Sequence, residues 1–164
     1  MIQFSYMDKS EKDIWLPQLF DLLYLNMQNI APSGMSYEEE REEWLSNVSP
    51  AIDKAPRQII MCFDGAELAG YIQYYTRDDM LMVEEIQLAP NYHRTMLFYR
   101  FCSFLAANLP DDIEYIEAFA EARNTHSQRI MQKLGMQIDA EEGGAYVHLR
   151  GKADIARKLF HSGR

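Results

Sequence analysis

The sequence predicts a mixed α/β fold, with one sheet of about seven strands that is mostly antiparallel and has helices on both faces. Three observations predict this fold. Segments with β-like and helical patterns alternate along the whole chain. Asp64-Gly65 marks a tight hairpin turn between two β-like segments. Finally, a helix connects the β-like segments Met80–Leu88 and Ile113–Ala120, and a helical crossover of this kind joins parallel strands.

The composition is that of one folded domain covering residues 1–164. The chain has 164 residues, of which 48% are hydrophobic, and this is enough for a sizeable core. Its net charge of −9 disfavours binding to nucleic acid, which requires clustered lysine and arginine. Residues 152–164 are expected to form a short helix or tail.

Cysteine usage and hydropathy predict a cytoplasmic protein. Cys62 and Cys102 lie in apolar runs, as reduced core thiols do. The four histidines are scattered without metal-ligand spacing, so no metal site is expected. Because the sequence shows neither an export signal nor an apolar run of about 20 residues, we expect no membrane association.

The first half of the chain predicts two helices between strands. Ile2–Tyr6 is expected to be a strand. A helix then begins between Asp13 and Pro17, with Asp13 as its cap and Pro17 in its first turn. Ser36 and Glu39 form a predicted capping box for the second helix.

Three strands are expected to follow as an antiparallel meander, and the second half then alternates helices and strands. The meander consists of Gln58–Phe63, Leu68–Thr76 and Met80–Leu88. Tyr92–Leu109 is predicted to be a long helix, and because it is apolar on more than one face we expect it to be deeply buried. The later elements are a strand at Ile113–Ala120, a helix at Asn124–Leu134 ending at Gly135, a hairpin of Met136–Asp139 and Ala145–Leu149 around Gly143-Gly144, and a short amphipathic helix at 152–161.

The order of these elements predicts a binding site for an anion. The amino end of a helix follows directly after the carboxyl end of the strand Met80–Leu88. Such a junction presents unpaired backbone N–H groups and the positive end of a helix dipole. A phosphate-bearing cofactor is therefore the expected ligand.

Two local patterns, together with the element order, resemble the GNAT acetyltransferase superfamily. The first is Val83-Glu-Glu-Ile-Gln-Leu-Ala-Pro-Asn-Tyr-His-Arg94, which is similar to the family's fourth strand and the start of its cofactor loop. The second is Asn124-x-x-Ser127 followed by Lys133-Leu-Gly135-Met136, which is similar to the family's Asn-x-x-Ala/Ser helix and its Lys-x-Gly-Phe ending. The resemblance implies a GNAT-like acyl-CoA N-acyltransferase fold with a splayed parallel pair of strands.

The resemblance also implies which residues bind acetyl-CoA. Backbone groups of the strand would bind the pantetheine arm, and the loop would bind the diphosphate through main-chain amides. Met96 and Phe98 stand where the family has glycines. The residues implied to bind the cofactor are Ile86, Gln87, Leu88, His93, Arg94, Thr95, Met96, Leu97, Phe98, Asn124 and Ser127. Helix capping is the alternative role of Asn124 and Ser127.

Glu84 and Glu85 are the candidate catalytic residues. Transfer to an amine requires removal of a proton from the ammonium, and in the family a carboxylate of this strand often does this. Adjacent strand residues face opposite sides of the sheet, so at most one of the two points into a given cleft. For either residue, a solvated or salt-bridged carboxylate is the alternative. The family's usual tyrosine acid is replaced by Met131, and Tyr99, Tyr115 or Tyr146 are alternatives for that role.

The sequence therefore indicates an acetyl-CoA-dependent N-acetyltransferase. We expect direct transfer to an amine of a small molecule or peptide, with no nucleic-acid partner. The alternative is a non-catalytic protein of the same fold that binds coenzyme A or another ligand. The oligomeric state stays open, and a homodimer is one alternative.

Overall fold

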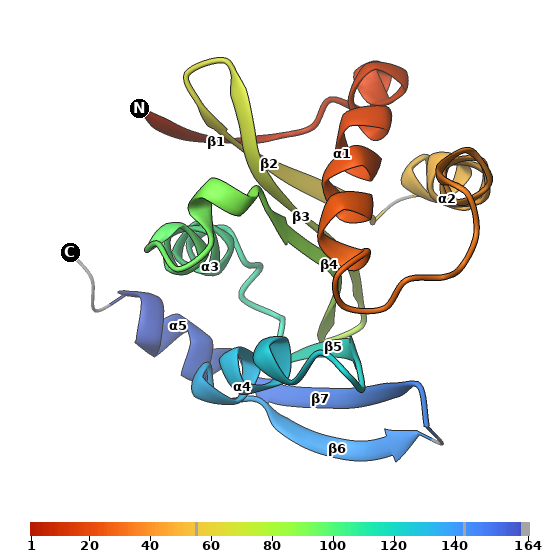
Figure 1. Ribbon diagram of the computed structural model, residues 1–164. Helices are drawn as coiled ribbons and strands as arrows, with labels where there is room; N and C mark the ends of the chain where they lie inside the picture. The colour runs from red at the N-terminus through yellow and green to blue at the C-terminus, as the bar shows by residue number, and fades with distance from the viewer. Residues whose placement is uncertain (55, 143, 162–164) are drawn as a thin grey trace. The chain divides into compact units, whose positions relative to one another are not determined.

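The computed structural model describes residues 1–54, 56–142 and 144–161, whose strands form one sheet (Figure 1). The strands follow the order β1-β2-β3-β4-β5-β7-β6, and the sheet is antiparallel except for the parallel pair β4 and β5. This confirms the predicted mixed sheet with its helix crossover. The strands are β1 (Ile2–Tyr6), β2 (Gln58–Asp64), β3 (Glu67–Arg77), β4 (Met80–Leu88), β5 (Tyr115–Glu121), β6 (Gln137–Glu142) and β7 (Tyr146–Lys152).

The chain divides into two compact units. The first consists of residues 1–74 and 85–94, and the second of residues 75–84 and 95–164. Both β3 and β4 contribute residues to each unit.

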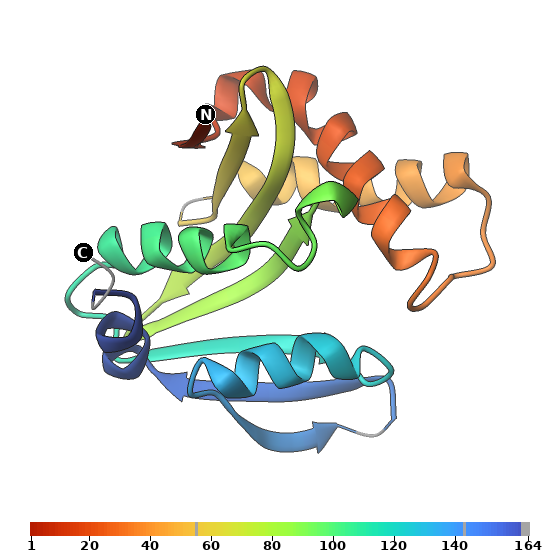
Figure 2. The same ribbon diagram turned by 60° about the vertical axis from the view of Figure 1, so that its left-hand side comes forward.

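In the first unit, two helices cover one face of β2 and β3 (Figures 1 and 2). They are α1 (Lys12–Met27) and α2 (Tyr37–Ile52). Their apolar faces and the facing strand residues form one core, because burial of apolar side chains drives their association. Its buried members are Met7, Leu16, Leu19, Leu22, Ile52, Ile59, Met61 and Tyr71.

The start of α1 differs from the prediction. A short 3₁₀ helix, η1 (Lys9–Glu11), precedes α1, and Asp8 rather than Asp13 accepts a capping hydrogen bond, from the Ser10 amide at 2.8 Å. Pro17 consequently lies in the second turn of α1. Proline is tolerated there at a cost, since it lacks the N–H that an interior helix residue donates.

The start of α2 confirms the predicted capping box. The Ser36 side chain accepts from the Glu39 amide, and the Glu39 carboxylate accepts in return from the Ser36 amide at 2.9 Å. Along α2, Trp44, Leu45 and Val48 pack against the core of the first unit.

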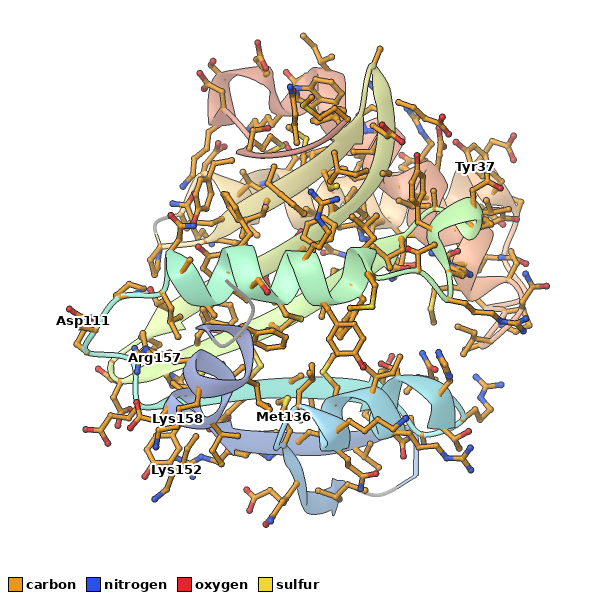
Figure 3. The ribbon with its side chains drawn as sticks, turned by 90° about the vertical axis from the view of Figure 1, so that its left-hand side faces the viewer. Tyr37, Asp111, Met136, Lys152, Arg157 and Lys158 are labelled. Atoms are coloured by element: carbon orange, nitrogen blue, oxygen red, sulfur yellow. The ribbon has the colours of Figure 1, made fainter. Side chains whose placement is uncertain are left out.

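The second unit contains the helices α3 (Leu97–Ala107), α4 (Thr125–Lys133) and α5 (Ala153–His161). Figure 2 shows α4 lying along β5 and β7. The apolar residues of β5 and β7 on the helix-covered face are buried, among them Ala118, Val147 and Leu149. The Arg157 guanidinium of α5 donates to the Pro110 carbonyl at 2.7 Å, which fixes α5 near the turn that precedes β5 (Figure 3).

The helix predicted at Tyr92–Leu109 is shorter than expected. A 3₁₀ turn, η2 (Pro90–Tyr92), follows β4, and α3 begins only at Leu97. Between them, Arg94 adopts a left-handed backbone with φ of +64°, which interrupts a helix. Burial is also one-sided, because Phe101 and Leu105 are buried while Tyr99 is 42% exposed.

The other elements agree with the predictions to within a few residues. The final hairpin is formed by β6 and β7, although Gly143 lies outside the described residues. The predicted tail helix is α5, and residues 162–164 are likewise outside the described chain. No helix among the described residues is long and apolar enough to cross a bilayer.

Candidate functional site

The predicted site residues occupy three segments. Glu85–Arg94, at the end of β4 and in the turn after it, belongs to the first unit. The second unit contains the start of α3 at Thr95–Phe98 and the start of α4 at Asn124–Ser127, together with Glu84.

The end of β4 is fixed by two side chains that hydrogen-bond to the Leu88 carbonyl. Asn26 of α1 donates to this oxygen from Nδ2 at 3.0 Å, and His93 approaches it with Nε2 at 2.9 Å. Because a carbonyl oxygen only accepts, Nε2 of His93 must carry the proton. The structure thus brings the predicted residues Leu88 and His93 together.

Glu85 lies in a mostly buried polar cluster. Its carboxylate accepts from Nε2 of Gln87 at 3.0 Å, and Gln87 is only 8% exposed. On β3, Tyr71 is fully buried and its hydroxyl has no hydrogen-bond partner among the described residues. Burial raises the pKa of Tyr71 well above its usual range, and the negative charge of Glu85 raises it further. Glu85 and Tyr71 are therefore electrostatic neighbours.

Glu84 and Ile86 alternate with Glu85 and Gln87 along β4. All four belong to the same strand, so Glu84 and Ile86 face the opposite side from the Gln87 amide. Glu84 is half-buried. The two candidate bases therefore have different surroundings.

The start of α3 has the features of an anion site. The N-terminal residue Met96 makes no side-chain capping hydrogen bond, and its own side chain is 66% exposed. Thr95 Oγ1 accepts from the Leu97 amide at 3.2 Å. The amides of Phe98 and Tyr99 follow in the first turn, where a helix offers them no internal partner. The donors at this helix end, which also carries the positive end of the dipole, suit a diphosphate.

Arg94 adds a positive charge immediately before α3. Its side chain is exposed and makes no hydrogen bond or ion pair with any residue that the structure describes. The neighbouring His93 ring is exposed as well. An exposed guanidinium is a favourable group for binding phosphate.

Asn124 and Ser127 form the cap of α4. The Asn124 side chain accepts from the Ser127 amide at 3.1 Å, which is the capping role given above as the alternative. Gln128 donates to the Glu121 and Ala122 carbonyls at 3.1 and 3.0 Å and fixes the turn from β5 into α4. Met131, at the position of the family's tyrosine, is buried and has no proton to donate.

A second group of charges lies on β5, β6 and β7. His148 places Nε2 3.0 Å from Glu117 and Nδ1 3.4 Å from Asp139, and Arg150 lies 3.2 Å from Glu117. An irregularity in β6 between Ile138 and Ala140 leaves Asp139 as the extra residue beside His148. Glu117 thus pairs with Arg150, and the His148 ring lies between Glu117 of β5 and Asp139 of β6.

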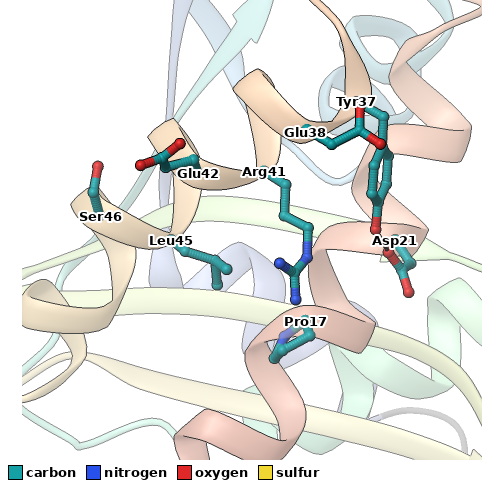
Figure 4. Close-up of a pocket in the computed structure, with 8 residues that line it drawn as sticks. All are labelled: Pro17, Asp21, Tyr37, Glu38, Arg41, Glu42, Leu45 and Ser46. Atoms are coloured by element: carbon teal, nitrogen blue, oxygen red, sulfur yellow. Dashed lines mark hydrogen bonds between the residues drawn. The ribbon is translucent and has the colours of Figure 1, made fainter.

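The groove between α1 and α2 has a volume of about 700 Å³ (Figure 4). Its lining combines charged residues of both signs, among them Asp21, Glu38 and Arg41, with the apolar residues Pro17 and Leu45. The Tyr37 hydroxyl donates to Asp21, and this hydrogen bond raises the pKa of Tyr37. The groove is open and carries none of the predicted site residues.

Comparison with known proteins identifies the fold. No protein-family model and no curated protein sequence matches the chain. Among solved structures, an acetyltransferase from Thermus thermophilus matches 93% of this chain and 97% of its own, with a TM-score of 0.72 at 14% identity. The PaiA N-acetyltransferase from Thermoplasma acidophilum, in complex with coenzyme A, matches 93% of this chain and 99% of its own, with a TM-score of 0.69 at 12% identity. The spermidine N-acetyltransferase SpeG from Vibrio cholerae matches 98% of both chains, with a TM-score of 0.65 at 11% identity.

The chain has the GNAT fold. In this GNAT fold, β4 ends at Leu88, and α3 begins nine residues later at Leu97. The first pattern that resembles the family, Val83–Arg94, therefore contains the end of β4, and the second, which begins at Asn124, contains the start of α4.

Sequence reasoning did not find two residues of the β4 cluster. These are Asn26 of α1 and Tyr71 of β3. The contacts of Asn26 span 61 and 62 residues of chain, and no local pattern encodes a contact of that range.

Proposed function

We propose that this chain is an acetyl-CoA-dependent N-acetyltransferase that acts on an amine of a small molecule or peptide. The main support for this proposal is the first turn of α3, whose N-terminal residue Met96 makes no side-chain capping hydrogen bond, in a chain with the GNAT fold. The exposed Arg94 precedes this turn in the sequence. The coenzyme A complex of the Thermoplasma protein supports the same cofactor here. We also propose that the protein acts in the cytoplasm.

We assign binding of the diphosphate to backbone amides and to one positively charged side chain. The amides of Phe98 and Tyr99 would donate to it, and Arg94 would supply an opposite charge. Thr95 is a further donor in the same loop, which also contains His93, whose Nε2 proton is donated to the Leu88 carbonyl. The main-chain groups of Ile86, Gln87 and Leu88 would bind the pantetheine arm, while Asn124 and Ser127 would lie at its sulfur end.

Bound acetyl-CoA supplies an acetyl group activated as a thioester. Glu84 or Glu85 would accept the proton that the acceptor ammonium must lose before its nitrogen can form the new C–N bond. A backbone N–H near Leu88 would stabilise the negative charge that develops on the carbonyl oxygen. The C–N bond would form at the thioester carbon and the C–S bond would break, and the thiolate would take up a proton equivalent to the one that the base removed.

A non-catalytic, ligand-binding role is the second candidate. It is favoured by Met96 and Phe98 at the glycine positions and by Met131 at the position of the tyrosine acid. The exposed Met96 side chain argues against obstruction of the helix end by that residue.

Thermal unfolding with acetyl-CoA, followed by a transfer assay, separates the candidates. We expect both acetyl-CoA and free coenzyme A to raise the melting temperature. A ligand at a hundred times its dissociation constant stabilises a protein by about 2.7 kcal/mol. We also expect thiol release from acetyl-CoA with at least one of a polyamine, an aminoglycoside and a peptide with a free amino terminus. Absence of any shift contradicts both the transferase and a coenzyme A-binding role, and binding without thiol release favours the second candidate.

A further inference from the structure

Asn26 uses both N–H hydrogens of its side chain to hold the end of β4. Its Nδ2 donates to Oε1 of Gln87 at 2.9 Å and to the Leu88 carbonyl at 3.0 Å. An asparagine amide has two hydrogens, so both are used. One side chain of α1 therefore fixes both a side chain and a main-chain group of β4.

The contact with Gln87 continues to Glu85. Because Oε1 of Gln87 accepts from Asn26, its Nε2 is turned to the other side, where it donates to the Glu85 carboxylate at 3.0 Å. Gln87 is 8% exposed, so little water competes for these bonds. The result is a directed chain of hydrogen bonds from Asn26 through Gln87 to Glu85.

The surroundings of Glu85 contain one further polar group. The buried Tyr71 hydroxyl lies near its carboxylate and has no hydrogen-bond partner among the described residues, which is costly for a buried donor. The Glu85 carboxylate is therefore both oriented by Gln87 and close to a hydroxyl. Glu84 faces the other side of β4.

We infer that Asn26 is a positioning residue which, through Gln87, orients Glu85 as the base of the proposed transfer and thereby selects Glu85 over Glu84. This inference rests on the proposed function. A base must be held in position relative to the proton that it removes, and small displacements reduce the rate strongly.

The first test is a double-mutant cycle on thiol release from acetyl-CoA. Asn26→Leu removes both donors, and Glu85→Gln removes the base. We expect each to lower the rate at saturating acetyl-CoA and amine by about 10- to 100-fold. Because the two residues act as a unit, the double variant should be no slower than Glu85→Gln alone. The dissociation constant for acetyl-CoA should change by less than about threefold.

A matched control comes from the same helix. Gln18→Leu removes an amide of α1 that is exposed and donates only to the Ile14 carbonyl of its own helix. It should not lower the rate by more than about threefold. Glu84→Gln changes the other candidate base of β4, so it is not a control but a direct comparison, and we expect it to be faster than Glu85→Gln. If Asn26→Leu does not fold, Asn26→Asp replaces it, since aspartate has the same shape without the donors.

A second measurement does not depend on turnover. The carboxyl carbon signal of Glu85, assigned with Glu85→Gln, is titrated by NMR. The nearby titratable groups are Glu84 on the same strand and Tyr71 on β3, whereas Asn26 and Gln87 are uncharged. A donor that loses its orientation no longer favours the charged carboxylate, so the pKa of Glu85 should rise by about half to one pH unit in Asn26→Leu and stay constant in Gln18→Leu.

The outcomes separate the two proposals. Wild-type protein that neither binds acetyl-CoA nor releases thiol contradicts the proposed function, while the NMR titration still decides whether Asn26 orients Glu85. An unchanged pKa of Glu85 in Asn26→Leu overturns the inference. So does a double variant in which the two losses multiply, or a Glu84→Gln variant that is as slow as Glu85→Gln.

Discussion

The Leu88 carbonyl receives hydrogen bonds from Asn26 and His93, and these occupy both of its lone pairs. The last peptide of β4 is thereby held in one orientation. Sequence reasoning correctly brought Leu88 and His93 into one segment, because they are close in the chain. It could not find Asn26, because the packing of α1 on the sheet determines that contact.

The two cysteines are predicted to be unreactive in the folded protein. Cys62 is fully buried, and burial raises the pKa of Cys102 to about 12. A thiol reacts as its thiolate, so both burial and the high pKa oppose reaction. We expect no rapid labelling by a thiol reagent at pH 8 and two labelled thiols after denaturation. Prompt labelling of either cysteine in the native protein would contradict the described core.

Among the elements, helix ends show most clearly what the sequence could predict. The capping box of α2 and the Asn124 cap of α4 were found, because short-range side-chain chemistry determines them. The start of α3 was placed too early, at Tyr92. The apolar pattern there continues through the turn. A glycine often marks a left-handed residue, but here that position is occupied by Arg94, so the sequence does not indicate the interruption of the helix.

Replacement of Gly135, at the end of α4, is predicted to destabilise the protein strongly. This glycine has φ of +86°, and a Cβ built on it would lie 2.5 Å from Cγ2 of Ile155. Gly65 is the matched control, since its φ is +63° and its surroundings are open. We expect Gly135→Ala to lower the free energy of unfolding by about 2–4 kcal/mol and Gly65→Ala by about 1 kcal/mol. Equal losses in urea denaturation would refute the contact with α5.

The capping box of α2 is predicted to weaken in acid. Hydrogen bonds from the backbone and side chain of Ser36 lower the pKa of Glu39. Since the pKa is lower in the folded state, this carboxylate stabilises the fold above its unfolded pKa and loses that effect as the pH falls through the folded value. The stability difference between wild type and Glu39→Ala should therefore be full at pH 7 and shrink below about pH 4.

Glu43→Ala, an exposed change on the same helix, is the control for that titration. Its stability difference from wild type should be small at both pH values. A difference for Glu39→Ala that is as large at pH 3 as at pH 7 would show that the capping box does not depend on the charge.

For the whole molecule, the order and type of the elements was the most predictable property. The hairpin at Asp64-Gly65, the meander and the helix crossover between parallel strands each follow from local signals and general connection rules. Together with the two motifs that resemble the GNAT superfamily, these signals predicted the GNAT fold, which solved structures at 11–14% identity share. The acceptor of the proposed transfer was not predictable, because no motif encodes the side chains that would bind it.

Binding of coenzyme A by the amides at the start of α3 is tested most directly by an amide NMR titration. We expect the Phe98 and Tyr99 amide signals to shift saturably at one coenzyme A per chain, because we propose that these amides donate to the diphosphate. The first turn of α2, which Ser36 and Glu39 already cap, serves as the internal control and should not shift. Saturable binding that leaves the Phe98 and Tyr99 signals unchanged would contradict this cofactor site. So would the absence of binding at about 1 mM coenzyme A, a concentration at which even weak binding is detectable.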